Sequence, residues 1–129
     1  GRALVEDAIG RPVAGFIAPA WLYGAEARAA LADAGFALAE DHMRVWRPAD
    51  DRVLARGPVV TWASRSPRRI ASSLAFAGLA RHALAPLRVV RVAVHPGDTG
   101  VPALLGSIDR TIAAVARDRR IAGYGALGD

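Results

Sequence analysis

Short apolar runs and longer helical segments alternate along the chain, and Pro and Gly residues separate them. The short runs are bounded by turn-forming residues, so we expect strands at 13–18, 36–39, 59–62, 89–94 and 121–124. Val45 and Trp46 are expected in a further edge strand, followed by a turn. Helical spacing and capping residues predict helices at 25–34, with Gly35 as the cap, at 66–84, and from Pro102 onward.

This order of elements predicts an α/β protein with a mainly parallel sheet, in a single region of 129 residues. The runs at 13–18 and 89–94 are almost continuously apolar, as in strands buried on both faces, so we expect them to be central. Ser66 suits the N-cap of the long helix, with Pro67 at its first position. The last helix carries an apolar stripe that should face the core, formed by Leu105, Ile108, Ile112 and Val115.

Composition narrows the class of protein. Hydrophobic residues make up 53% of the chain, which is enough for a core, and no apolar run reaches the roughly 18 residues that span a bilayer. The chain has no Cys, which excludes disulfides and thiolate metal sites. All 17 basic residues are Arg, a bias typical of bacterial GC-rich coding, and the bacterial cytoplasm is the favoured location. The arginines are scattered among acidic residues, so we expect no nucleic-acid partner despite the net charge of +5.

Polar and aromatic residues gather directly after the expected strands, where (β/α) barrels build their active sites. His95 follows the apolar run 89–94, and Asp98 comes three residues later. An imidazole there suits a general acid or a metal ligand. Equally, His95 could end a strand beside a loop that Asp98 caps, and the residues alone do not separate these two interpretations.

Other expected strand ends carry weaker signals. Trp21 and Trp62 suit either the binding of sugar rings or the capping of a core. Arg65 lies near the start of a helix, where a cation is unfavourable unless a carboxylate or an anionic ligand compensates it. The run Glu40-Asp41-His42 is interpreted as a solvated strand end, because neighbouring residues of a strand point to opposite faces.

Three strings resemble landmarks of the polysaccharide deacetylase superfamily, in an uncharacterised deacetylase-like branch. They are GFIAPAWL at 15–22, GPVVTWASRS at 57–66 and VAVHPGD at 92–98, in the family's order. The resemblance implies a distorted (β/α)7-type barrel and a metal-dependent hydrolase that removes acetyl groups from a carbohydrate. It assigns His95 as the catalytic acid toward the leaving group and Trp21 as the aromatic residue of the third motif. Ala18 replaces the Arg that is common in that motif.

The resemblance also implies that metal ligands and binding partners lie outside this chain. The family holds a divalent metal, often zinc, through an Asp and two His that precede this region, so we expect a C-terminal half whose metal ligands lie mostly outside it. The expected partners are an acetylated carbohydrate and either the N-terminal half or a second copy of the chain. The candidate substrate-binding residues are Trp21, Trp62, Arg65 and Asp98. The alternative function is a non-catalytic carbohydrate-binding or assembly module without a metal.

Overall fold

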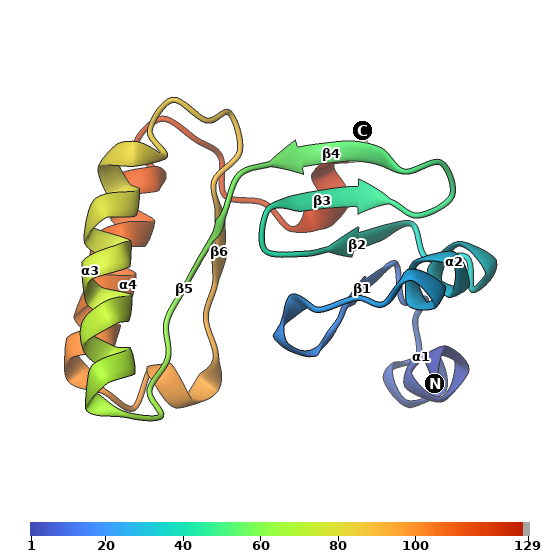
Figure 1. Ribbon diagram of the computed structural model, residues 1–129, viewed down its shortest axis with the longest axis horizontal. Coiled ribbons are helices and arrows are strands. Elements are labelled where there is room, and N and C mark those ends of the chain that lie inside the picture. Colours follow the sequence, from blue (N-terminus) through green and yellow to red (C-terminus); the bar gives the residue numbers. More distant parts are fainter. Residues whose placement is uncertain (128–129) are drawn as a thin grey trace. The chain divides into compact units, whose positions relative to one another are not determined.

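The computed structural model describes residues 1–127 and shows an α/β protein whose chain divides into two compact units. The first unit contains residues 1–56 and the segment from Tyr124 onward, and the second contains residues 57–123 (Figure 1). None of the helices found between residues 1 and 127 is long and apolar enough to cross a membrane.

The first unit is built on a four-stranded sheet in the order β1-β2-β3-β4. Strands β1 (Gly15–Ile17) and β2 (Leu38–Glu40) are parallel, whereas β3 (Arg44–Arg47) and β4 (Arg52–Arg56) continue the sheet in antiparallel fashion. Its helices are α1 (Arg2–Ile9), α2 (Ala25–Asp33), η1 (Pro19–Trp21) and η3 (Tyr124–Leu127). A small core of Leu31, Ala39 and Trp46 joins α2 to β2 and β3.

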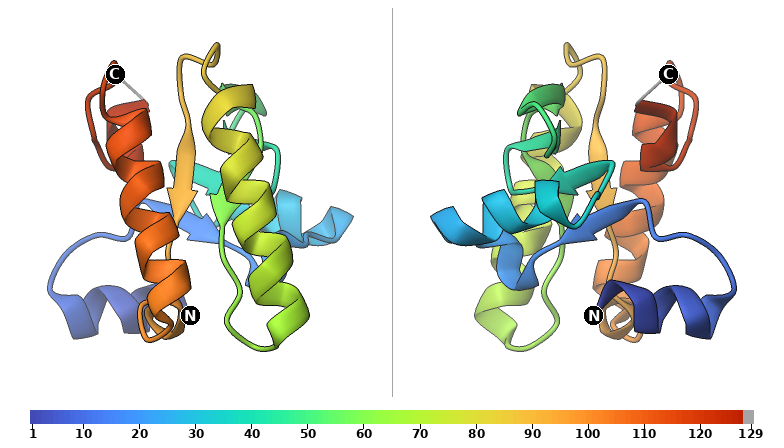
Figure 2. Two further views of the ribbon diagram at one scale, coloured as in Figure 1. Left: turned by 90° about the vertical axis from the view of Figure 1, so that its left-hand side faces the viewer. Right: turned by 90° about the vertical axis from the view of Figure 1, so that its right-hand side faces the viewer.

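The second unit is a β-α-β-α segment. Strands β5 (Val59–Thr61) and β6 (Arg91–Ala93) are parallel, with Val60 opposite Val92. Helix α3 (Pro67–Ala83) connects them, and η2 (Pro96–Asp98) and α4 (Pro102–Val115) follow β6. Helices α3 and α4 lie side by side with their carboxyl ends at the same end of the unit (Figure 2).

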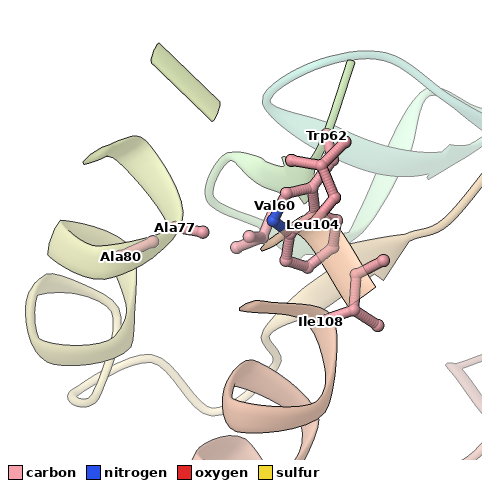
Figure 3. Close-up of a cluster of buried hydrophobic side chains, with 6 residues drawn as sticks. All are labelled: Val60, Trp62, Ala77, Ala80, Leu104 and Ile108. Carbon is pink, nitrogen blue, oxygen red and sulfur yellow. The ribbon is translucent and has the colours of Figure 1, made fainter. Parts of the chain in front are cut away.

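The core of the second unit explains why these segments fold together. Val60 and Trp62 from the first strand region pack between α3 and α4, against the small residues Ala77 and Ala80 of α3 (Figure 3). Alanines on α3 allow the bulky indole and the α4 side chains to approach closely. As predicted, α3 begins at Pro67, and the backbone N–H of Arg69 donates to the hydroxyl of Ser66 over 3.4 Å.

The predicted apolar stripe of α4 was partly wrong. Leu105 and Ile112 are 40% and 37% exposed, because the residues directly before them, Leu104 and Thr111, face the core instead. The buried face carries two polar side chains, which are tolerated because both are hydrogen bonded: the Thr111 hydroxyl donates to the Ser107 carbonyl over 2.8 Å, and the Ser107 hydroxyl accepts from Trp62. The buried residues of α4 are Leu104, Ser107, Ile108 and Thr111.

The predicted α/β class is confirmed, but several finer predictions about the strands were wrong. Half of the four strand pairings are antiparallel, and among residues 1–127 no closed sheet is found. The runs at 13–18 and 89–94 were expected to be central, yet β1 pairs only with β2 and β6 only with β5 in the described chain. The segment 121–124 forms no strand, and α1 and β4 were not predicted.

Candidate functional site

The carboxyl ends of β5 and β6 bring most of the predicted site residues of the second unit to one place. The strands run parallel in register, so the loops that follow them start side by side. A Cβ atom placed on Gly97 would lie 3.4 Å from the hydroxyl oxygen of Ser64, so the two loops are in contact. Trp62, Arg65, His95 and Asp98 therefore belong to one end of this small sheet.

His95 and Asp98 have opposite roles in their loop. The backbone N–H of His95 donates to Oδ2 of Asp98 over 3.2 Å, and the N–H of Asp98 donates to the carbonyl of His95 over 2.9 Å. Asp98 is only 2% exposed, whereas the His95 side chain is exposed. His95 and Asp98 thus form a capping box that closes a tight turn, and the His95 side chain is exposed at that turn.

Trp62 and Arg65 also differ in accessibility. Trp62 is 3% exposed, and its indole N–H donates to the hydroxyl of Ser107 over 3.1 Å. This position matches the core-capping interpretation of Trp62 and leaves almost none of its ring for a sugar. Arg65 is exposed in the bend before α3, and none of the ion pairs found within residues 1–127 includes it.

A second cluster lies at the carboxyl ends of the parallel strands β1 and β2, in the first unit. The Trp21 indole N–H donates to Oε1 of Glu40 over 3.0 Å, and the Trp21 ring packs at a tilt of 38° against His42, with 4.8 Å between ring centroids. The Tyr23 hydroxyl donates to the Glu40 carbonyl over 2.6 Å and accepts from the N–H of Ala18 over 3.0 Å. Side-chain hydrogen bonds therefore connect the carboxyl ends of β1 and β2.

The expectation of a solvated strand end at Glu40 was wrong, because Glu40 is 1% exposed. The missed signal was its spacing from Leu38, since residues two apart in a strand share a face. The turn that holds Trp21 is also unusual: Ala20 and Trp21 have positive φ values of 52° and 57°. Such a backbone is unfavourable for residues with a Cβ and persists only where other contacts hold it, and the Trp21–Glu40 hydrogen bond is one such contact.

Hydrogen bonds stabilise the charged carboxylate of Asp41. Its carboxylate accepts from the N–H groups of Met43 and Arg44 over 2.8 and 2.9 Å, and from Nε of Arg44 over 3.2 Å. Burial alone would raise the pKa of Asp41, but these hydrogen bonds outweigh it and the pKa is lowered. Burial also raises the pKa of Tyr23, so this hydroxyl stays protonated and can donate to the backbone.

The described residues do not assemble a metal site. No group of three or more His, Cys, Asp or Glu side chains close enough to hold a metal ion is found in residues 1–127. An ion held by one Asp and two His, as the resemblance implies, would therefore need ligands other than the groups seen here. The expectation that the residues after the strands build one active site stays a prediction for Trp21, because Trp21 belongs to the other unit.

Comparisons with protein-family models, curated proteins and solved structures found no match to this chain.

Proposed function

We propose that this chain is a region of a polysaccharide-deacetylase-like hydrolase that removes acetyl groups from a carbohydrate, and that it contributes part of a distorted (β/α)7-type barrel. The observation that carries the proposal is the exposed His95 at the carboxyl end of β6, on a turn closed by the buried Asp98. Parallel strands with catalytic groups at their carboxyl ends are the common plan of such barrels.

In this proposal, His95 acts as the general acid. Water adds to the acetyl carbonyl, the bond from the carbonyl carbon to the sugar nitrogen or oxygen breaks, and the His95 imidazolium gives its proton to the departing atom. Acetate and the deacetylated sugar are the products. A divalent metal would lower the pKa of the attacking water and polarise the carbonyl. The proton transfer is the step assigned to a residue of this chain.

The loop geometry suits that role. Hydrogen bonds between His95 and Asp98 hold the turn, and the His95 side chain is exposed, so the ring has a fixed base and an accessible front. Arg65 is exposed at the neighbouring strand end and is proposed to bind a polar or anionic group of the sugar chain. The buried Asp98 would then contribute by positioning His95, rather than by touching the substrate.

A non-catalytic carbohydrate-binding module is the second candidate. It is favoured by the partly exposed ring of Trp21, which packs against the exposed His42 at the other parallel strand end. Aromatic rings at such positions bind the apolar faces of sugars.

The test compares acetate release from acetylated oligosaccharides by the unaltered protein, His95→Ala and Thr99→Ala, with zinc added. Loss of general acid catalysis typically costs about 10²–10⁴ in rate, so His95→Ala should lose that much turnover. Its stability should change by about 1 kcal/mol or less, because the backbone bond to Asp98 remains. Thr99→Ala is the matched control, since it removes only a 2.8 Å hydrogen bond from the same loop.

The outcomes separate the two candidates. Full turnover by a folded His95→Ala protein would remove the catalytic assignment. Binding of the oligosaccharide without acetate release, retained in His95→Ala and lost in Trp21→Ala, would instead identify the binding module.

A further inference from the structure

A hollow of about 440 Å³ lies at the carboxyl ends of α3 and α4 and is lined by residues of the second unit. Four arginines line it: Arg81 from α3, Arg110 from α4, and Arg117 and Arg119 from the segment after α4. Among the described residues of the lining, Asp118 is the only acidic one, so the hollow carries a clear excess of positive charge. Its volume falls within the range of about 300–1,000 Å³ that is usual for small-molecule sites.

Small residues line part of the hollow. Ala113 and Ala114 follow Arg110 by three and four positions, so they share its side of α4 and add little bulk to the lining. Ala80, Ala85 and Val90 add further apolar lining. A ligand that fits such a hollow combines an apolar body with an anionic group.

Hydrogen bonds to neutral oxygen atoms hold two of the four arginines in place. Arg119 donates through Nε and Nη2 to the Leu87 carbonyl over 3.3 and 2.9 Å, and Nη1 of Arg81 lies 3.3 Å from the Thr111 hydroxyl oxygen. These partners are neutral. Within the described part of the chain, no ion pair joins any of the four arginines to a carboxylate. Guanidinium groups that are held by neutral partners and form no ion pair are well suited to phosphate recognition.

Helix dipoles offer a simpler explanation for some of these cations. The carboxyl ends of α3 and α4 each carry a partial negative charge of roughly half a unit, which attracts arginines without any ligand. Two such ends and Asp118 offset only about half of the four positive charges. Dipole compensation also does not require an open space between the cations.

We propose that this hollow binds a small organic phosphate, with the phosphate between the arginines and the organic part against the alanines. The proposal is independent of the deacetylase function, because the hollow is lined from the carboxyl ends of the helices and shares no residue with the His95 loop. The four arginines are Arg81, Arg110, Arg117 and Arg119.

The experiment titrates the protein with phenyl phosphate, inorganic phosphate and phenol at low salt, by calorimetry and by NMR of the arginine side chains. Phenyl phosphate should bind saturably, more tightly than the other two probes, and should shift the resonances of the four arginines. Removing two charges in Arg110→Gln/Arg117→Gln should weaken binding by about tenfold or more. Arg68→Gln/Arg69→Gln, which removes two exposed charges from the first turn of α3, should not.

Ala113→Leu provides the decisive second variant, because it fills the hollow, keeps every charge and replaces Ala by a nearly equal helix former. It should weaken phenyl phosphate binding about as strongly as the double arginine variant, by about tenfold. Absence of saturable binding, equal affinity for inorganic phosphate, or unchanged affinity in Ala113→Leu would overturn the proposal. Equal weakening by the Arg68→Gln/Arg69→Gln control would also overturn it, since only net charge would then matter.

Discussion

Replacement of Trp62 distinguishes a core residue from a sugar-binding platform. A tryptophan side chain buries about 200 Å², which at about 25 cal/mol per Å² corresponds to about 5 kcal/mol of transfer free energy. Trp62 is 3% exposed and packs with Leu104 and Ile108, so nearly all of this area is buried. Alanine keeps a small part of the contact, and large-to-small changes of this kind cost about 3–5 kcal/mol. We therefore expect Trp62→Ala to lower the free energy of unfolding by that amount.

The hydrogen bond to Ser107 can be measured separately. Trp62→Phe keeps an aromatic ring but leaves the buried Ser107 hydroxyl without its 3.1 Å donor, which should cost about 1–3 kcal/mol. In a cycle with Ser107→Ala, the two changes should be coupled by about 1 kcal/mol.

Urea unfolding followed by far-UV circular dichroism measures these losses, since the helices and not the mutated indole dominate the signal. Leu79→Ala is the control, because Leu79 lies on α3 of the same unit and is 66% exposed, and it should change stability by no more than about 0.5 kcal/mol. A loss below about 1 kcal/mol in Trp62→Ala would refute the core assignment, since surface aromatics cost that little. That result would instead support the predicted role of Trp62 in substrate binding.

Two further predictions concern the first unit. The pKa of Asp41 is lowered, so this residue stabilises the fold above its ordinary pKa of 3.8, and the stabilisation is lost as the pH falls through the folded-state pKa. Asp41→Asn should therefore reduce the loss of stability at acidic pH. An unchanged loss of stability at acidic pH would contradict this. Tyr23→Phe removes a hydroxyl that links the Glu40 carbonyl to the N–H of Ala18, so it should cost about 1–3 kcal/mol in urea unfolding, with a near-neutral result contradicting the linking role.

Local signals predicted the elements that depend on neighbours in the chain. Ser66 and Pro67 marked the start of α3, because a hydroxyl acceptor and a fixed φ favour a helix start in any context. Gly35 marked the end of α2 for a similar reason, and its φ is 68°. Strand β4 was not predicted, because it holds only three apolar residues between two arginines and forms a strand through pairing with β3.

The sequence predicted which residues form the candidate site, but only in part which of them are exposed. His95 and Arg65 are exposed at strand ends, as a binding or catalytic role requires. Asp98 and Trp62 come from the same strand ends but are buried, which no spacing rule reveals. The arginine-lined hollow was not predicted at all, since Arg81 and Arg119 are far apart in the chain and meet only through the packing of α3 against α4.

The sequence by itself determined the α/β class, the boundaries of α3 and the positions of polar groups after strands, because caps, turns and apolar periodicity act over a few residues. Tertiary structure alone decided which face of α4 is buried, that Glu40 is buried against the Trp21 indole, and that two of the strand pairings are antiparallel. These features depend on the volume available between elements and on hydrogen-bond partners distant in the chain. Leu105 and Leu104 are adjacent and equally apolar, and only the packing of Trp62 against Ser107 and Leu104 selects between them.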